Sequence, residues 1–298
     1  KTTGRDNVNF QLNGAEIQWK PRRTWKLNFT AVSGTVLLLL VVAMAVLAPI
    51  ISPQDPTKTQ LINTFKPPIG FGGTMQNPLG TDHLGRDVLS RLLYGAQVSV
   101  LVGVLSVVIS GAIGVILGLV AGFYGGWIDD VVMRLVDVLL AFPFILLAIA
   151  VMAVVGGNLT NIILLLALTR WVDYARLVRA ETLAVKEREF VQAARAAGAR
   201  DWLLIWRHVT PNVFTPVIVV ATFSVAQMII AEASLSFLGV GIQPPTPTWG
   251  GMLSDARLYL RTAPWLATLP GLMIMLIVLA SNLVGDWVRD TLDPRLTD

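Results

Sequence analysis

Residues 98–121 read VSVLVGVLSVVISGAIGVILGLVA, and this stretch decides the fold class. It lies inside a longer run, from Leu92 to Ile128, that contains no charged residue. A helix of about 20 apolar residues crosses the core of a bilayer. The stretch therefore predicts a transmembrane helix, and a chain built on such helices is expected to be an all-α membrane protein.

The composition of the whole chain supports the same class. Apolar residues make up 54% of the 298 residues and charged residues only 14%, with a mean hydropathy of +0.65. Soluble domains carry roughly 25% charged residues. The chain has no cysteine and two histidines, which excludes thiol chemistry and argues against a histidine-rich metal centre. The net charge of +4 is interpreted as a topology signal, not as a sign of nucleic-acid binding.

Six stretches have the length and apolarity of a membrane span. The predicted spans are Phe29–Ile51, Val98–Ala121, Leu135–Val155, Thr160–Val178, Asn212–Phe237 and Pro264–Gly285. Gly156, Gly157 and Asn158 predict a tight turn between the third and fourth spans. The first apolar run is longer than that of a cleaved signal peptide, so we expect it to stay in the protein. The chain begins at Lys1 and not at a methionine, which leaves room for a short leader before it.

The distribution of lysine and arginine predicts the orientation. One side carries Lys1, Arg5, Lys20, Arg22, Arg23, Lys26, Arg134, Arg176, Arg179, Lys186, Arg188, Arg195, Arg200, Arg207, Arg289 and Arg295. The other side carries Lys58, Lys66, Arg86, Arg91, Arg257 and Arg261. Cytoplasmic loops hold the excess of positive charge, so both termini and the loop at about 181–212 are expected in the cytoplasm.

Small residues and prolines mark particular points within the spans. Gly111, Gly114, Gly118 and Gly122 form a stripe at helical spacing, which predicts close packing against a second helix. Three prolines, Pro143, Pro216 and Pro270, lie within predicted spans, where neighbouring helices can satisfy the freed carbonyls. Thr210 followed by Pro211 is typical of a helix N-cap and first position, and predicts the start of the fifth span.

The loop at about 181–212 is patterned. Phe190, Ala193, Ala194 and Ala197 fall on one predicted helical face, and Arg188, Gln192 and Arg195 fall on the other. Gly198 suits the end of this helix, and Asp201 suits the N-cap of a second short helix, Trp202–Val209. A small alanine-lined face favours docking of another protein. The alternative is an amphipathic helix that lies in solvent or on the membrane surface.

The segment from Gln192 to Gly198 resembles the EAA loop of ABC-importer permeases. That pattern is EAA, three residues, glycine, nine residues and I-x-L-P. Ala193, Ala194, Gly198 and Pro211 keep its spacing, whereas Gln192 replaces the glutamate, His208 the isoleucine and Thr210 the leucine. The resemblance implies an ATPase-coupling helix formed by Glu189, Phe190, Gln192, Ala193, Ala194, Arg195, Ala197, Gly198 and Pro211.

Three further stretches look like the C-type permease of the dipeptide/oligopeptide/nickel importer family. They are residues 79–91, LGTDHLGRDVLSR; residues 231–239 with 243–250, AEASLSFLG and QPPTPTWG; and Gly285-Asp286 with Arg289-Asp290 and residues 292–295, LDPR. The resemblance implies a six-span permease of the type I ABC-importer fold in the bacterial inner membrane. Its implied partners are a second permease subunit, two ATP-binding subunits, a periplasmic or lipid-anchored substrate-binding protein and membrane lipid.

The chain contains no G-x-x-x-x-G-K-[ST] loop, so we expect neither ATP hydrolysis nor a cofactor in this subunit. Three other classes compete with the importer interpretation. A secondary transporter would predict internal repeats. A membrane hydrolase would need a Ser-His-Asp constellation, and both histidines lie outside the spans. A receptor-like or structural membrane protein fits the composition, and co-purification with an ATPase would separate it from an importer subunit.

A few ionisable residues fall at predicted membrane depth and are candidates for the pathway. Arg170 and Asp173 lie three residues apart in the fourth span, and Glu232 lies in the fifth. Asp137 in the third span is a similar case. The alternative is a structural ion pair or a position near the inner surface.

Asp82, His83 and Asp87 precede the second span, with a short helix expected at Asp87–Gln97. A single histidine with two carboxylates is a weak metal signature, so solvated or capping roles are expected for them.

The expected organisation has two parts. Residues 1–97 would form a cytoplasmic segment, the first span and a proline-rich periplasmic segment. Residues 98–298 would form a five-helix core with the coupling loop. The sequence leaves the cargo open among dipeptides, oligopeptides, nickel chelates, glutathione, opines and sugars.

Overall fold

The computed structural model describes residues 9–12, 15–18 and 29–292. Within these ranges the only strands are β1 (Asn9–Leu12) and β2 (Ala15–Gln18), which form an antiparallel pair. The remaining regular structure is helical, as expected for apolar runs whose backbone groups must be satisfied within each segment. The basic residues among the first 26, and Asp293, Pro294 and Arg295, lie outside the described residues.

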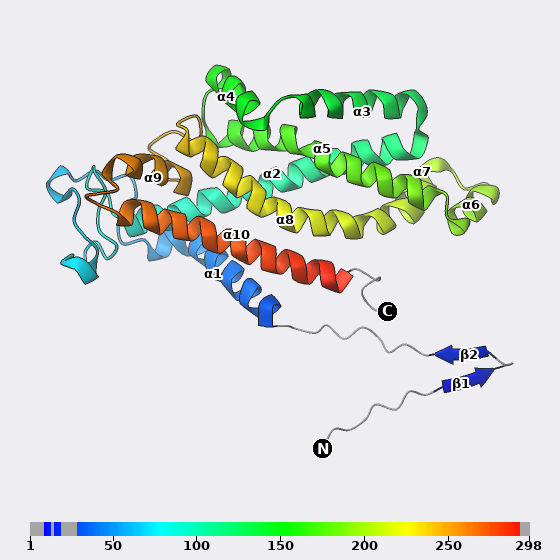
Figure 1. Cartoon of the computed structure of the whole chain (residues 1–298), viewed down its shortest axis with the longest axis horizontal. Helices are drawn as coiled ribbons and strands as arrows, with labels where there is room; N and C mark the ends of the chain where they lie inside the picture. The colour runs from blue at the N-terminus through cyan, green and yellow to red at the C-terminus, as the bar shows by residue number, and fades with distance from the viewer. Residues whose placement is uncertain (1–8, 13–14, 19–28, 293–298) are drawn as a thin grey trace.

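Five long helices form a bundle (Figure 1): α1 (Phe29–Ile51), α2 (Val88–Tyr124), α5 (Leu159–Lys186), α8 (Thr210–Phe237) and α10 (Trp265–Leu292). The most extensive packing is between α2 and α5, and α8 packs against both α2 and α10. Helix α1 lies along α10 and α2. The expected first span coincides with α1, and α2, α5 and α8 contain the second, fourth and fifth spans. Helix α10 covers the sixth expected span except for Pro264.

Short helices close the two ends of the bundle. Helix α9 (Trp249–Ala256) lies at one end, beside the segment that joins α1 to α2 and carries η1 (Leu61–Asn63) and η2 (Ile69–Phe71). Helix α6 (Glu189–Ala196) protrudes at the opposite end (Figure 1). We call these the α9 end and the α6 end. The 3-10 turn η4 (Arg257–Tyr259) follows α9.

Four described helices are long and apolar enough to cross a membrane by themselves. They are α1, α2, the continuous helix Asp201–Phe237 and α10. The bent pair α3 (Gly126–Ala141) and α4 (Phe144–Val155) makes a fifth if it counts as one span. Helix α5 is not among them, because Arg170, Asp173 and Arg176 follow its apolar first half. The chain is therefore an all-α membrane protein, and its described residues contain four or five spans by this measure.

The third predicted span, Leu135–Val155, is wrong as a single helix. The chain breaks at Phe142 and Pro143, and α3 and α4 meet at 89°. Proline disfavours the helical conformation of the residue before it, and Phe142 takes an extended conformation with φ −96° and ψ 128°. The turn predicted at Gly156–Asn158 is confirmed, because the Asn158 side chain accepts a hydrogen bond from Asn161 N and caps α5.

The glycine stripe of α2 is confirmed as a packing surface, and its partner is α5. A Cβ on Gly114 would lie 2.4 Å from Tyr174 Cβ, and one on Gly118 would lie 2.7 Å from the Ala175 carbonyl oxygen. A Cβ on Gly122 would lie 2.8 Å from Thr182 Cβ. Because glycine allows this approach, the backbones of α2 and α5 pack more closely than larger residues would permit.

Two expected helix starts fall inside longer helices. The short helix at Asp87–Gln97 is the first part of α2, so the boundary expected at residue 97 lies within a continuous helix. Thr210 is not an N-cap, because α7 (Asp201–Leu203) and the π-helical turn η3 (Leu204–Val209) lead without a break into α8. A π-turn widens the helix just before Pro211, which relieves the clash of a proline ring with the preceding turn.

Candidate functional site

Helix α6 has one fully buried side chain, Val191, and ends at a glycine. Val191 is buried in the main core cluster. The helix ends where Gly198 takes φ +83°, a left-handed conformation that glycine adopts without a steric penalty. The turn is closed by Ala199 N donating to the Ala194 carbonyl at 3.1 Å. The end predicted at Gly198 is therefore confirmed.

The side of α6 opposite Val191 is exposed. Glu189, Phe190, Ala193, Ala196 and Ala197 all lie on this surface, and Phe190 is 44% exposed. The sequence had placed Ala194 on the same face. The structure corrects this, because Ala194 lies one turn from Val191 and packs half-buried against the core. The exposed face is therefore centred on Ala193.

Polar contacts tie the loop to the ends of α5 and α2. Gln192 Nε2 donates to the Lys186 carbonyl at 3.0 Å, so this side chain bonds within the loop. Lys186 Nζ donates to the Gly122 carbonyl at 2.9 Å. The Arg195 guanidinium lies over the Phe123 ring, 5.5 Å from its centroid. Side chains of this loop thereby contact the last turns of two long helices.

Pro211 lies in α8 and not in α6, but it lines the same cavity as Arg188, the N-cap of α6. This cavity of about 530 Å3 opens between α5, α8 and α10 at the α6 end. Its wall includes Glu181, Arg188, Pro211 and Arg289. Thr210 Oγ1 donates to the Ile205 carbonyl at 2.9 Å, so its hydroxyl satisfies the preceding π-turn.

The two candidate pathway residues in α5 do contact each other. Arg170 Nη1 lies 3.8 Å from Asp173 Oδ2, and both side chains are partly exposed. The Arg170 guanidinium also lies over the Phe144 ring of α4, 5.1 Å from its centroid. Asp137 pairs elsewhere, with Arg176 Nη2 at 3.0 Å. The arrangement leaves Asp173 accessible on the surface of this subunit.

Glu232 differs from this pair because it is fully buried. Ser236 Oγ donates a hydrogen bond of 2.7 Å to Glu232 Oε1. The same Ser236 oxygen accepts a hydrogen bond from Ile242 N at 3.2 Å. Glu232 therefore fixes the turn that follows α8 and does not present a free carboxylate to solvent.

Of the two carboxylates before α2, Asp87 caps the helix. Asp87 Oδ2 accepts hydrogen bonds from Ser90 N at 2.8 Å and Ser90 Oγ at 2.7 Å, which caps α2. His83 stacks on Tyr259, with ring centroids 5.4 Å apart. The capping interpretation is correct for Asp87, whereas Asp82 accepts from Leu84 N and Arg86 N in the turn before α2. Both carboxylates are buried and not solvated. Among the described residues no group of histidine and carboxylate side chains could hold a metal ion.

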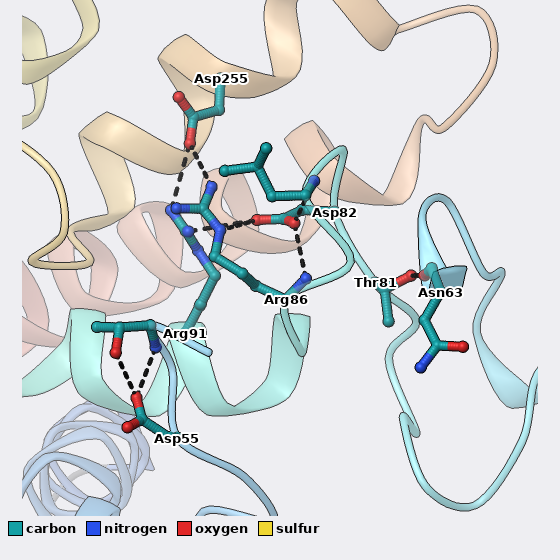
Figure 2. Close-up of polar contacts among 9 residues, drawn as sticks. Asp55, Asn63, Thr81, Asp82, Arg86, Arg91 and Asp255 are labelled. Carbon is teal, nitrogen blue, oxygen red and sulfur yellow. Dashed lines mark hydrogen bonds and ion pairs between the residues drawn. The ribbon is translucent and has the colours of Figure 1, made fainter. Parts of the chain in front are cut away.

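Sequence reasoning missed a buried ion-pair cluster at the α9 end, shown in Figure 2. The Arg86 and Arg91 guanidinium groups lie between Asp82 and Asp255. Arg86 Nε lies 2.6 Å and Arg91 Nη1 3.2 Å from Asp82 Oδ2. The three residues near α2 occur in the motif quoted at 79–91, but nothing in the sequence pairs them with Asp255 of α9.

Comparison with known proteins places the chain in a family. Residues 114–298 match the family described as "Binding-protein-dependent transport system inner membrane component", and residues 21–68 match the "N-terminal TM domain of oligopeptide transport permease C". The chain belongs to this family of inner-membrane permeases of ABC transporters.

Three relatives show how far the similarity extends. A di/tripeptide transport permease of Pseudomonas aeruginosa is 46% identical over 90% of this chain and 89% of its own length. A glutathione transport permease of Escherichia coli is 44% identical over 92% of this chain and 89% of its own length. A dipeptide transport permease of Alkalihalophilus pseudofirmus is 40% identical, covering 91% and 88%.

Membership defines the general role of the subunit. It is a multi-pass component of the inner membrane and acts in transport, not in catalysis. Transport of this kind depends on a binding protein and on ATP hydrolysis by a partner. The C-type peptide-importer permease inferred from the three sequence stretches is thereby confirmed.

Proposed function

We propose that this chain forms one half of the translocation pathway of an importer for small peptides, including tripeptides such as glutathione. The proposal draws on three relatives that transport dipeptides, di/tripeptides and glutathione and resemble this chain over nine-tenths of its length. In it, α5 and the bent pair α3–α4 each cross the membrane, which gives six spans in a type I importer fold. A second permease subunit supplies the other half of the pathway.

The proposed orientation places the α6 end in the cytoplasm. The loop and helix ends there carry Arg176, Arg179, Lys186, Arg188, Arg195, Arg200 and Arg207. The opposite side carries Lys58, Lys66, Arg86, Arg91, Arg257 and Arg261, and two of these, Arg86 and Arg91, are paired with Asp82 and Asp255. The positive-inside rule counts lysines and arginines, and most of those in the sequence fall on the side of the α6 end, which supports a cytoplasmic position for it. Both termini would lie on that side, and the binding protein would dock at the α9 end.

The observation that carries the coupling proposal is the exposed face of α6. Its centre, Ala193, is small, and its rim includes the charged Glu189 and the aromatic Phe190. Such a surface fits a groove on an ATPase subunit, where small residues allow close approach. In this proposal Gln192 and Arg195 hold α6 to the bundle, and Ala194 packs on its inner side. Ala197 and Gly198 form the end of the helix. Pro211 continues the unit into α8.

The candidate pathway residues take two different roles in this proposal. Arg170 and Asp173 are partly exposed and would face the partner permease or the solute. Glu232 would act by positioning the loop after α8, because its carboxylate is buried and bonded to Ser236. Residues 98–298 would form the pathway core, and residues 1–97, which end within α2, would add the outer helix α1 and the segment at the α9 end.

The test uses one substitution on the exposed face and a matched control. Ala193→Glu places a long charged side chain at the centre of the face, whereas Ala193→Ser keeps it small. All subunits are co-expressed, and both ATPase recovery with this chain and peptide uptake are measured. Ala193→Glu should lose most ATPase recovery and uptake while the second permease stays bound, and Ala193→Ser should behave as wild type. Normal recovery and uptake with Ala193→Glu would place the coupling surface elsewhere.

A further inference from the structure

A cavity of about 190 Å3 lies at the α9 end, between the start of α2, the loop after α8 and the start of α9. Buried arginines Arg86 and Arg91 form part of its wall. Exposed residues of the loop, Gln243–Thr246, also line it and leave it open to the surface. The cavity therefore has buried positive charge inside and an open mouth.

The two carboxylates of the cluster bind these arginines in different ways. Asp82 is fixed, because its Oδ1 accepts hydrogen bonds from Leu84 N and Arg86 N, both at 2.9 Å. Asp255 uses one oxygen, Oδ2, for both arginines, at 3.3 Å from each. Charge-assisted bonds of this kind are usually about 2.7–2.9 Å long. The side chain of Asp255 is also 37% exposed, against 7% for Asp82.

The charged groups and hydrogen-bond donors that line this cavity favour the binding of an anion. Arg86, Arg91 and Asp255 line it, whereas Asp82 does not. Thr248, the N-cap of α9, and Gly251, from its first turn, line it as well. The start of a helix carries partial positive charge. The two arginines and the start of α9 would therefore stabilise any carboxylate in this position. Asp255 occupies the position now, but its contacts to the arginines are long and its side chain is accessible to solvent.

We propose that this cavity binds a small-molecule carboxylate, such as the terminal carboxylate of a transported peptide, which displaces Asp255 from Arg86 and Arg91. Asp82 remains as the fixed counter-charge. Because Asp255 belongs to α9 and the arginines to the start of α2 and the turn before it, the exchange would release α9 from this contact. The link to transport rests on the proposed function, but binding itself is tested without it.

The first experiment is chemical rescue in the complex of both permease chains and the ATPases. In Asp255→Ala, acetate takes the place of the missing carboxylate and should raise the melting temperature by about 3 °C at saturation. Acetamide, and chloride at equal ionic strength, should have no such effect. Wild type should respond less, because Asp255 competes. Asp255→Ala combined with Arg91→Gln should not respond.

The second experiment identifies the solute by comparing dialanine with dialanine amide. Asp255→Asn removes the competing charge at nearly constant shape, and it should bind dialanine at least about tenfold more tightly than wild type does, with no gain for the amide. An equal response to chloride, or no carboxylate-dependent binding in either variant, would overturn the proposal. So would failure of both variants to assemble, since Asp255 would then be a structural clamp. Peptide uptake by the wild-type complex tests the import function separately.

Discussion

Trp249 Nε1 donates a 3.1 Å hydrogen bond to the backbone carbonyl of Leu92, which lies 157 positions earlier in the chain. The indole is completely buried. A Cβ on Gly95 would lie 3.0 Å from Trp249 Cδ1, so the ring packs directly on α2 one turn beyond Leu92. This contact and the arginine cluster fasten α9 to the start of α2.

Replacing this tryptophan should weaken the α9 end. Trp249→Phe removes the hydrogen bond and part of a buried ring, and we expect a loss of about 1–3 kcal/mol in unfolding free energy. Thermal unfolding of the purified subunit in detergent measures it. Trp127→Phe is the control, because Trp127 is 74% exposed. Equal effects of the two changes would contradict the role assigned to the Trp249 contact.

The α2–α5 packing predicts opposite outcomes for two glycines one turn apart. Gly114→Ala would place Cβ against Tyr174 and the Trp171 carbonyl, and should cost about 1–3 kcal/mol by forcing the helices apart. Gly111→Ala meets only Tyr174 at 3.8 Å and should be tolerated. The yield of monodisperse protein and its melting temperature are the readouts. A well-folded Gly114→Ala would show that this part of α2 does not pack as described.

The ion pair between Asp129 and Arg179 should hold α3 to α5. Arg179 Nη2 lies 2.5 Å from Asp129 Oδ2, and Nε makes a second contact to Oδ1. Asp129→Ala should cost about 1–2 kcal/mol, because a paired and partly buried arginine loses its acceptor. Asp137→Ala is the control, since its pair with Arg176 is largely exposed and should contribute less than about 1 kcal/mol. A double-mutant cycle with Arg179→Ala isolates the interaction, and a coupling energy near zero would refute it.

Gly198 should be sensitive to backbone conformation and not to space. No atom lies within 4 Å of a Cβ built there, but φ is +83°. Gly198→Ala should therefore destabilise the end of α6 by about 1 kcal/mol, and Gly198→Asn should do so less, because asparagine tolerates this conformation. Amide hydrogen exchange across residues 189–199 measures the local effect. Equal exchange in all three proteins would contradict this role.

Much of the helical architecture was predictable because it depends on patterns within short stretches of the sequence. Charge-free runs located the long helices, and glycine at helical spacing identified the packing face of α2. The partner of that face was not predictable, since α5 is not marked by small residues where it meets Gly114: it presents Tyr174. The break at Pro143 was misjudged because prolines also occur inside intact spans, as Pro216 and Pro270 do.

In the candidate site, too, local features were predictable and long-range contacts were not. The exposed helix and its glycine stop follow from local sequence, so α6 was located correctly. The arginine cluster depends on contacts between residues more than 160 positions apart, and Asp255 carries no local signal of its role. The buried side of α6 was assigned wrongly for Ala194, because the prediction of the helix faces did not include Val191, the buried residue of this helix.

Helix α2 runs without interruption from beside Asp87 to Tyr124. Arg91 of the arginine cluster lies near the first residue of α2. Phe123, whose ring contacts Arg195 of α6, lies near the last residue of α2. Its 37 residues make a rod about 55 Å long. Tilting such a lever by about 5° around its midpoint displaces each tip by roughly 2.4 Å in opposite directions. A rigid tilt of α2 would therefore shift the arginine cluster and the contact beneath α6 together.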